Sequence, residues 1–214
     1  MLGKNIGIME TITEKEKKVT GLFAQKFYYA FRALFHPITR TLMRLGVSPN
    51  AVTFTSMVLG AVAGVYFAMD RLWAGMIFGY FMAFSDIVDG QLAKACGKTT
   101  KFGGILDSTI DRYNEFFIFA GLGIRYYFLE RPIWTLLCAS VFLGSVMISY
   151  IKARAEAVGF ECNVGKLQRP ERLTILAIGI AFRGLWLDSA IAILALFTQV
   201  TVLHRILHIY KQSK

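Results

Sequence analysis

The sequence predicts an all-α integral membrane protein, with six transmembrane helices and an N-terminal amphipathic helix at the membrane interface. Of its 214 residues, 55% are hydrophobic, and the mean hydropathy is +0.50, which is too apolar for an ordinary soluble domain. Six apolar segments can be drawn, and most approach the roughly 20 residues that a helix needs to cross the bilayer. The formal charge of +10 suits a lipid bilayer with an anionic surface, or anionic substrates. A nucleic-acid partner is not expected in so hydrophobic a chain.

Short polar connections separate the six apolar segments, so one transmembrane domain is expected over residues 47–214. The fifth segment is the shortest and has an arginine near each end. The predicted helices cover residues 51–69, 72–95, 103–128, 133–155, 171–184 and 187–209.

Residues 1–46 differ from the rest of the chain, and we interpret them as a cytoplasmic tail followed by an interfacial helix. The first 25 residues carry too many charges to contain the apolar core of a signal peptide. Residues 20–46 mix aromatic side chains with Lys26, Arg32, Arg40 and Arg44, a composition typical of an amphipathic helix lying in the membrane surface. A soluble cap on the bundle is the alternative.

The distribution of lysine and arginine predicts the orientation of the helices in the cell membrane. Six crossings place both termini on the same side. Nineteen basic residues then lie on that side, in residues 1–50, 94–101, 152–172 and 205–214, against four on the other. The positive-inside rule therefore places both termini in the cytoplasm.

Residues 85–115, SDIVDGQLAKACGKTTKFGGILDSTIDRYNE, contain four aspartates at the cytoplasmic ends of the second and third predicted helices. Acids in membrane helices are rare and costly, so they indicate a functional site. Because residues three or four apart share a helix face, Asp86 should neighbour Asp89, and Asp107 should neighbour Asp111. Small residues on the same faces, such as Gly90 and Gly103, allow a backbone or a ligand to approach closely.

Four carboxylates that face one another repel unless cations balance them. The nearest basic residues in the sequence, Lys94 and Arg112, are too few for ion pairing alone. Two divalent ions such as Mg²⁺ would balance the charge, since hard cations prefer carboxylate oxygen and commonly bridge phosphates. A cation channel or transporter is the alternative from another functional class. It would need acids continuing toward the far side of the membrane, and the first, fourth and fifth helices have none in their middles.

The pattern Asp86-x2-Asp89-Gly90-x2-Ala93-Lys94-x8-Gly103-x3-Asp107-x3-Asp111 resembles the signature of the CDP-alcohol phosphotransferases. One position departs from it, because the family usually has arginine where this chain has Lys94. Both residues are cationic, but lysine cannot make a planar bidentate contact with phosphate. The departure leaves the reaction class in place and puts the shape of the phosphate contact in doubt.

This resemblance implies a six-helix enzyme in which a hydroxyl of an acceptor alcohol displaces CMP from a CDP-linked lipid. It implies that Asp86, Asp89 and Asp107 hold two ions, Mg²⁺ or Mn²⁺, and that Asp111 is both a metal neighbour and the catalytic base. It also implies a homodimer. The nucleotide-binding residues implied by position are Gly90, Ala93, Lys94, Gly97, Thr100 and Gly103, completed by Asn50 and Thr53.

Residues 149–176, SYIKARAEAVGFECNVGKLQRPERLTIL, place several basic side chains on the side of the aspartates. Such a cluster suits an acceptor that carries its own phosphate, although positive-inside charge without a ligand is the alternative. The stretch closely resembles the bacterial phosphatidylinositol-phosphate synthases of the family. That resemblance implies CDP-diacylglycerol as donor and inositol 1-phosphate as acceptor, with the acceptor phosphate bound by Lys152, Arg172 and Arg205. A glycerol 3-phosphate acceptor and a CDP-archaeol donor remain alternatives.

Overall fold

The computed structural model describes residues 37–97, 99–162, 164–165 and 169–213, and the chain divides into two compact units, Met1–Val47 and Ser48–Lys214. In the first unit, the described residues 37–44 are helical. A turn follows, in which the Leu45 amide donates to the Thr41 carbonyl at 3.0 Å. The earlier part of the predicted interfacial helix, residues 20–36, lies outside the described residues.

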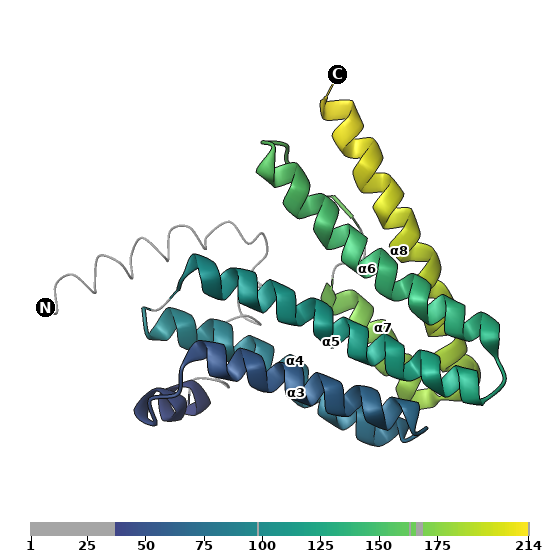
Figure 1. Ribbon diagram of the computed structural model, residues 1–214, viewed down its shortest axis with the longest axis horizontal. Helices are drawn as coiled ribbons and strands as arrows, with labels where there is room; N and C mark the ends of the chain where they lie inside the picture. Colours follow the sequence, from purple (N-terminus) through teal and green to yellow (C-terminus); the bar gives the residue numbers. More distant parts are fainter. Residues whose placement is uncertain (1–36, 98, 163, 166–168, 214) are drawn as a thin grey trace, which may run out of the picture. The chain divides into compact units, whose positions relative to one another are not determined.

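The second unit is built from six helices, and its described residues contain no strand (Figure 1). The all-α prediction is confirmed, and each predicted apolar segment forms a helix. The helices are α3 (Pro49–Ala68), α4 (Leu72–Ala95), α5 (Lys101–Phe128), α6 (Pro132–Ala157), α7 (Arg169–Phe182) and α8 (Gly184–Gln212). The shortest of them, α7, starts and ends two residues before the predicted bounds. Pro170 suits the first turn of a helix, and Arg183, with φ +56°, does not continue it.

Short turns close the helices into three hairpins at one end of the unit. The turns between α3 and α4, between α5 and α6, and between α7 and α8 each contain one non-glycine residue with positive φ: Asp70 (58°), Glu130 (56°) and Arg183 (56°). The connections at the other end are longer, spanning residues 96–100 and 158–168. Since α4 ends and α5 begins there, this longer-loop end is the end that carries the aspartates.

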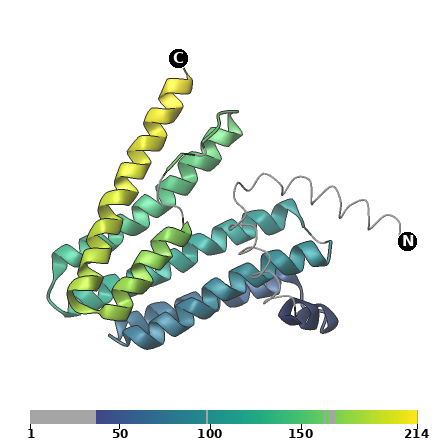
Figure 2. The ribbon, with the colours of Figure 1, turned by 180° about the vertical axis from the view of Figure 1, so that it is seen from behind.

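Helix α3 is the central packing element of the first three helices. It packs along both α4 and α5, whereas α4 and α5 scarcely touch each other. Helix α6 packs against α5 and α8, and α7 packs against α8 and α4 (Figures 1 and 2). The two helices that carry the aspartates are therefore held in position mainly through α3.

Glycines let α3 and α5 come into backbone contact. A Cβ on Gly121 of α5 would overlap the backbone carbonyl of Gly64, and a Cβ on Gly64 would overlap the backbone carbonyl of Phe117. Close approach through small residues is the usual way in which membrane helices gain packing energy, since the lipid offers no hydrophobic drive. The α3–α5 spacing thus depends on the absence of side chains at these two positions.

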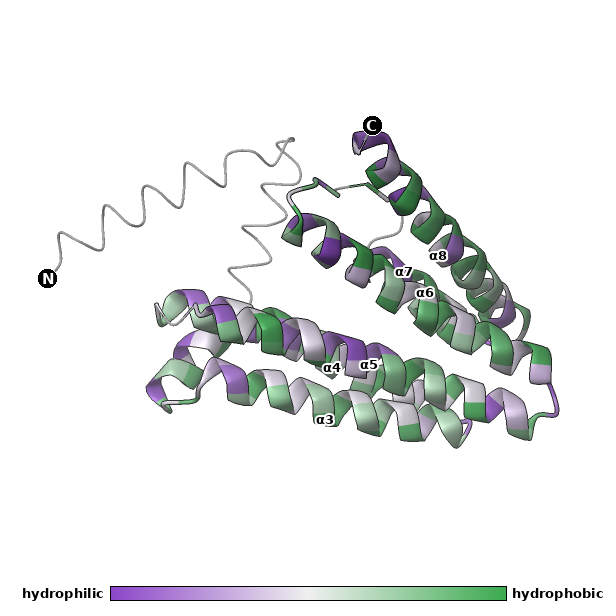
Figure 3. Cartoon of the chain, turned by 45° about the horizontal axis from the view of Figure 1, so that its top comes forward, coloured by the Kyte–Doolittle hydropathy of each residue, from purple (hydrophilic) through white to green (hydrophobic). Residues whose placement is uncertain are grey.

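The outer surface of the six-helix unit is apolar. In Figure 3, hydrophobic colour predominates along α6 and α8, whereas hydrophilic patches interrupt α5. Large exposed side chains on the outer faces include Leu136, Leu143, Leu196 and Leu203, as expected where lipid is the solvent.

Four helices, α3, α4, α6 and α8, are long and apolar enough to cross a membrane. Helix α5 carries charged residues in its first half, and α7 has only 14 residues.

A buried acid at the short-turn end was not anticipated from the sequence. Asp188, near the start of α8, accepts a hydrogen bond from the Tyr126 hydroxyl at 2.6 Å and pairs with Arg131 at 2.9 Å. The Arg131 guanidinium also lies over the rings of Tyr126 and Trp134. Helix α8 is thereby fastened to the turn between α5 and α6, far from the four aspartates.

We expect Gly64→Ala to lower the stability of the protein by about 1–3 kcal/mol, the usual cost of overpacking a tight contact. The added methyl meets backbone rather than a flexible side chain, so α3 and α5 must separate. Thermal unfolding in detergent measures the effect. The matched control is Gly79→Ala on α4, where no heavy atom lies within 4 Å of the new Cβ. Equal midpoints for the two variants would contradict the close contact.

Candidate active site

Three of the four predicted acids converge at the longer-loop end. Asp86 of α4 and Asp107 and Asp111 of α5 each offer a carboxylate oxygen, and these oxygens lie within 4.8 Å of one another. No other group of three or more such ligands is found among the described residues. The side chains of Asp86 and Asp111 are 22% and 14% exposed, so water and solutes can reach them. Three carboxylates at this spacing form a donor set that suits a hard divalent cation.

The fourth acid, Asp89, lies outside this group of three and contacts α3. Its side chain is buried and accepts a hydrogen bond from the Thr53 hydroxyl. Three residues turn a helix by about 300°, about 60° short of a full turn. This difference is enough for Asp86 to point toward α5 while Asp89 points toward α3. Thr53 also lies 3.1 Å from the Pro49 carbonyl, but the carboxylate is the stronger acceptor.

The residues assigned to the nucleotide surround the starts of α3 and α5 and the end of α4. Thr100 caps α5 by accepting from the Gly103 amide at 2.9 Å. A Cβ built on Gly103 would lie 3.7 Å from Oδ1 of Asn50, so α3 and α5 begin side by side. The structure therefore places Asn50, Thr100 and Gly103 together, and Thr53 follows Asn50 by about one turn of α3.

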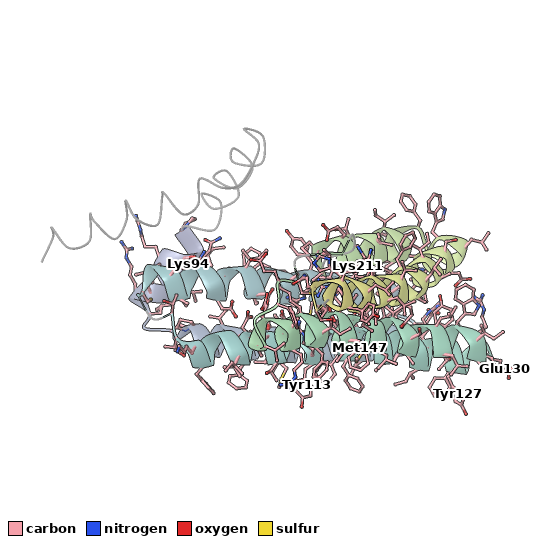
Figure 4. The ribbon with its side chains drawn as sticks, turned by 90° about the horizontal axis from the view of Figure 1, so that it is seen from above. Lys94, Tyr113, Tyr127, Glu130, Met147 and Lys211 are labelled. Carbon is pink, nitrogen blue, oxygen red and sulfur yellow. The ribbon has the colours of Figure 1, made fainter. Side chains whose placement is uncertain are left out.

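Open space lies beside the predicted nucleotide-binding residues in the last turns of α4. A Cβ on Gly90 or Gly97 would have no heavy atom within 4 Å. Gly97 ends the helix with φ +64°, a conformation that favours glycine. Ala93 is half-buried, and Lys94 is exposed near the end of α4, at the other end of the unit from Glu130 (Figure 4). A ligand could therefore lie against the backbone of this helix.

Arg169 at the start of α7 inserts its guanidinium into the acid cluster. Its Nη1 lies 2.9 Å from Oδ2 of Asp86 and 2.6 Å from Oδ1 of Asp111, and its Nε lies 3.9 Å from Glu115. Arg112 does contact the cluster, with its Nη1 at 3.5 Å from Oδ2 of Asp111, but Arg169, which the sequence did not indicate as a partner of these acids, lies closer to them. Arg169 is 83 residues from Asp86 in the sequence, and only the folding of α7 against α4 brings them together.

Glu115 connects this cluster to one of the predicted acceptor residues. It is 6% exposed and pairs with the equally buried Arg172 at 2.8 Å. Glu115 was not predicted as a site residue, although it follows Asp111 by four residues and therefore shares its helix face. Arg172 is thus close to the acids, with a carboxylate partner of its own.

The other two predicted acceptor residues lie on α6 and α8. Arg205 donates from Nε to the Val164 carbonyl at 3.0 Å and from Nη1 to the Ile148 carbonyl, which ties α8 to the connection between α6 and α7. Lys152 is half-exposed and lies 3.7 Å from Glu156, one turn along α6. Both residues are on the longer-loop side of the unit.

Comparison with known proteins identifies the family. Residues 46–206 match the family model of the CDP-alcohol phosphatidyltransferases. This chain belongs to that family. The predicted resemblance is confirmed, and the protein is an enzyme of the phosphatidyltransferase class.

Relatives in the CDP-alcohol phosphatidyltransferase family share most of the chain. A phosphatidylinositol phosphate synthase of Mycobacterium bovis is 36% identical over 197 residues, covering 83% of this chain and 87% of its own length. The synthase of Streptomyces avermitilis is 32% identical over 213 residues, covering 92% and 85%.

Solved structures show the same fold. The Mycobacterium tuberculosis phosphatidylinositol phosphate synthase in complex with manganese and citrate has a TM-score of 0.77 at 32% identity, covering 81% of this chain and 88% of that one. A structure of the same enzyme with CDP-DAG bound has a TM-score of 0.76 at 31% identity, covering 81% and 92%.

We expect Thr53→Val to destabilise the protein by about 1–3 kcal/mol, because it leaves the buried Asp89 carboxylate without its hydroxyl donor. Thr53→Ser should restore most of the loss. Thr55→Val is the control, because Thr55 is exposed and its hydroxyl contacts only the Ala51 carbonyl in its own helix. Thermal unfolding in detergent compares the three variants. A loss no larger at position 53 than at position 55 would refute a stabilising Thr53–Asp89 contact.

Proposed function

We propose that this enzyme transfers a phosphatidyl group from CDP-diacylglycerol to a hydroxyl of inositol 1-phosphate, releasing CMP and forming phosphatidylinositol phosphate. The acceptor oxygen forms a bond to the lipid-linked phosphorus, the bond from that phosphorus to CMP breaks, and the hydroxyl proton passes to a carboxylate. The observation that carries the proposal is the convergence of Asp86, Asp107 and Asp111 in a chain 36% identical to a synthase of that name.

The donor set fits the metals that the family resemblance implies. Carboxylate oxygens within 4.8 Å of one another suit Mg²⁺ or Mn²⁺ better than softer ions. We assign two such ions to Asp86, Asp89, Asp107 and Asp111. When bound, they supply Lewis-acid polarisation of the pyrophosphate and stabilise charge on the leaving group. Thr53 orients Asp89 by its hydrogen bond.

We assign the general base to Asp111. It is the acid of the cluster that lies deepest along α5, and its partly buried carboxylate is close to the basic residues that begin α7. The nucleotide would occupy the surface formed by Asn50, Thr53, Gly90, Ala93, Lys94, Gly97, Thr100 and Gly103. The open space beside Gly90 and Gly97 supports this placement.

The acceptor phosphate is assigned to Lys152, Arg172 and Arg205. All three lie at the acid-bearing end, and Arg172 shares Glu115 with Arg169. Arginine suits this role because its planar fork matches two phosphate oxygens. The half-exposed Lys152 can leave Glu156 at little cost, since exposed ion pairs contribute little stability.

We further propose that all six helices of residues 47–214 cross the cell membrane, with both termini and the acids on the cytoplasmic side. Helices α5 and α7 complete the three hairpins, although their charge or length departs from that of an isolated apolar span. The excess of lysine and arginine at the longer-loop end supports this orientation. Residues 1–46 would form a cytoplasmic tail and an interfacial helix, and the family resemblance implies a homodimer.

Asp111→Asn should reduce CMP release by at least about 10²-fold, the usual contribution of a general base, while binding of CDP-diacylglycerol persists. Turnover and binding are measured separately on the purified enzyme with Mg²⁺ or Mn²⁺. Asp70→Asn is the control, because Asp70 pairs with Arg125 at the short-turn end. Normal turnover in Asp111→Asn would disprove the base assignment.

The acceptor is tested by offering CDP-diacylglycerol with inositol 1-phosphate, free inositol or glycerol 3-phosphate. We expect CMP release only with inositol 1-phosphate, since the basic cluster requires a phosphate and the relatives are named for this product. Release only with glycerol 3-phosphate would keep the chemistry and overturn the substrate. Activity with CDP-archaeol but not with CDP-diacylglycerol would change the donor. Metal-ion flux without any CMP release would favour the transporter alternative.

A further inference from the structure

The guanidinium of Arg169 lies where the assigned metal ligands meet. We propose that Arg169 is an exchangeable counter-cation, which neutralises Asp86 and Asp111 until divalent ions displace it. The inference rests on the proposed function, because it takes these two acids as metal ligands. The proposed function assigns no role to Arg169.

The geometry makes the two cations competitors. Nη1 of Arg169 is 2.6 Å from Asp111 and 2.9 Å from Asp86, so one nitrogen contacts carboxylates from both helices. A divalent ion binds carboxylate oxygen at about 2.0–2.6 Å. Even on the remaining oxygens of these acids, such an ion would lie within a few ångströms of the guanidinium and repel it. Metal binding therefore requires Arg169 to move.

Arg169 has a second anionic partner that allows this movement. Its Nε is 3.9 Å from Oε1 of Glu115, which is already held by Arg172 at 2.8 Å. Glu115 can therefore retain the side chain of Arg169 after Asp86 and Asp111 have been released. Arg172, at 6% exposure, is fixed, whereas Arg169 is 22% exposed and has more room to change position.

Arg169 also engages the proposed base. While its Nη1 contacts Oδ1 of Asp111 at 2.6 Å, the guanidinium occupies the position from which an acceptor hydroxyl would approach that oxygen. Displacement of Arg169 frees the oxygen. Metal binding and exposure of the base would thus occur together.

The test is Mn²⁺ binding to the full-length enzyme in detergent, after divalent ions have been removed with EDTA. Arg169→Gln should bind Mn²⁺ about tenfold more tightly, because Mn²⁺ no longer has to displace an arginine from the carboxylates, and one ion pair of moderate strength corresponds to about a tenfold change in affinity. Its thermal midpoint in EDTA should fall, because in the described part of the chain only the longer Arg112–Asp111 contact at 3.5 Å then offsets the repulsion among the acids, and its gain in midpoint on adding Mn²⁺ should exceed that of the wild type.

Two further variants complete the experiment. Arg169→Lys keeps the positive charge but lacks the planar guanidinium that can contact two carboxylates at once, so its Mn²⁺ affinity should lie between those of the wild type and Arg169→Gln. If Arg169→Gln does not fold, Arg169→Lys provides the test in its place. Arg125→Gln removes an arginine paired with Asp70 at the other end of the unit, and should leave Mn²⁺ affinity unchanged.

Each result decides a different claim. If the wild type binds Mn²⁺ and neither Arg169 variant binds it more tightly, the counter-cation role is overturned while the metal site stands. If the wild type does not bind Mn²⁺, or if Asp86→Asn binds it equally well, the proposed metal site itself fails. Tighter binding in Arg169→Gln, with Arg125→Gln unchanged, supports the inference.

Discussion

The central physical constraint in this protein is the cost of holding several carboxylates within a few ångströms of one another at the edge of an apolar bundle. Mutual repulsion and partial loss of water both disfavour the arrangement. The structure compensates four of the acids locally. Asp89 accepts from Thr53, Asp86 and Asp111 share Arg169, and Glu115 pairs with Arg172. Removing one partner of such a buried set leaves an uncompensated charge, which costs more than the pair contributes.

The same constraint explains the division of labour among the helices. Helices α4 and α5 carry the acids and scarcely contact each other, so their separation is not set by direct packing. It is set by α3, which packs on both and meets α5 at Gly64 and Gly121. The helix that contributes no acid therefore controls the distance between those that do. Helix α7 supplies the cations Arg169 and Arg172, which pair with these acids.

Most of the helices and the acid pattern could be predicted from the sequence because both depend on local regularities. Apolar runs of membrane-spanning length identify helices, and a spacing of three or four residues identifies a shared face. The pairing of Arg169 with Asp86 depends on contacts across 83 residues, and no local pattern encodes it. Asp188 was missed for the same reason, since its partners Tyr126 and Arg131 belong to another hairpin. A signal for Arg169 did exist in the basic stretch that begins α7, but its partner could not be deduced.

The separation of Asp89 from the other acids shows a subtler limit. Residues three apart share a face only approximately, and the 60° difference matters when neighbouring helices lie on both sides. Asp86 then faces one neighbour and Asp89 another. Whether two acids of one motif meet the same partner depends on where the adjacent helices stand, which the spacing alone does not specify.

The three short turns also bear on how the chain enters the membrane during synthesis. In the proposed orientation, the part of each helical hairpin that must cross the bilayer to the far side is one short turn. The first turn contains Asp70 beside Arg71, and the second contains Glu130 beside Arg131. Each of these turns therefore translocates with no net charge, and the third carries Arg183 alone. In this orientation the strongly basic segments stay in the cytoplasm. Besides the turn residues, only Arg125 and Asp188 accompany the hairpins to the far side, so pairwise insertion of helical hairpins moves little net charge across the hydrocarbon.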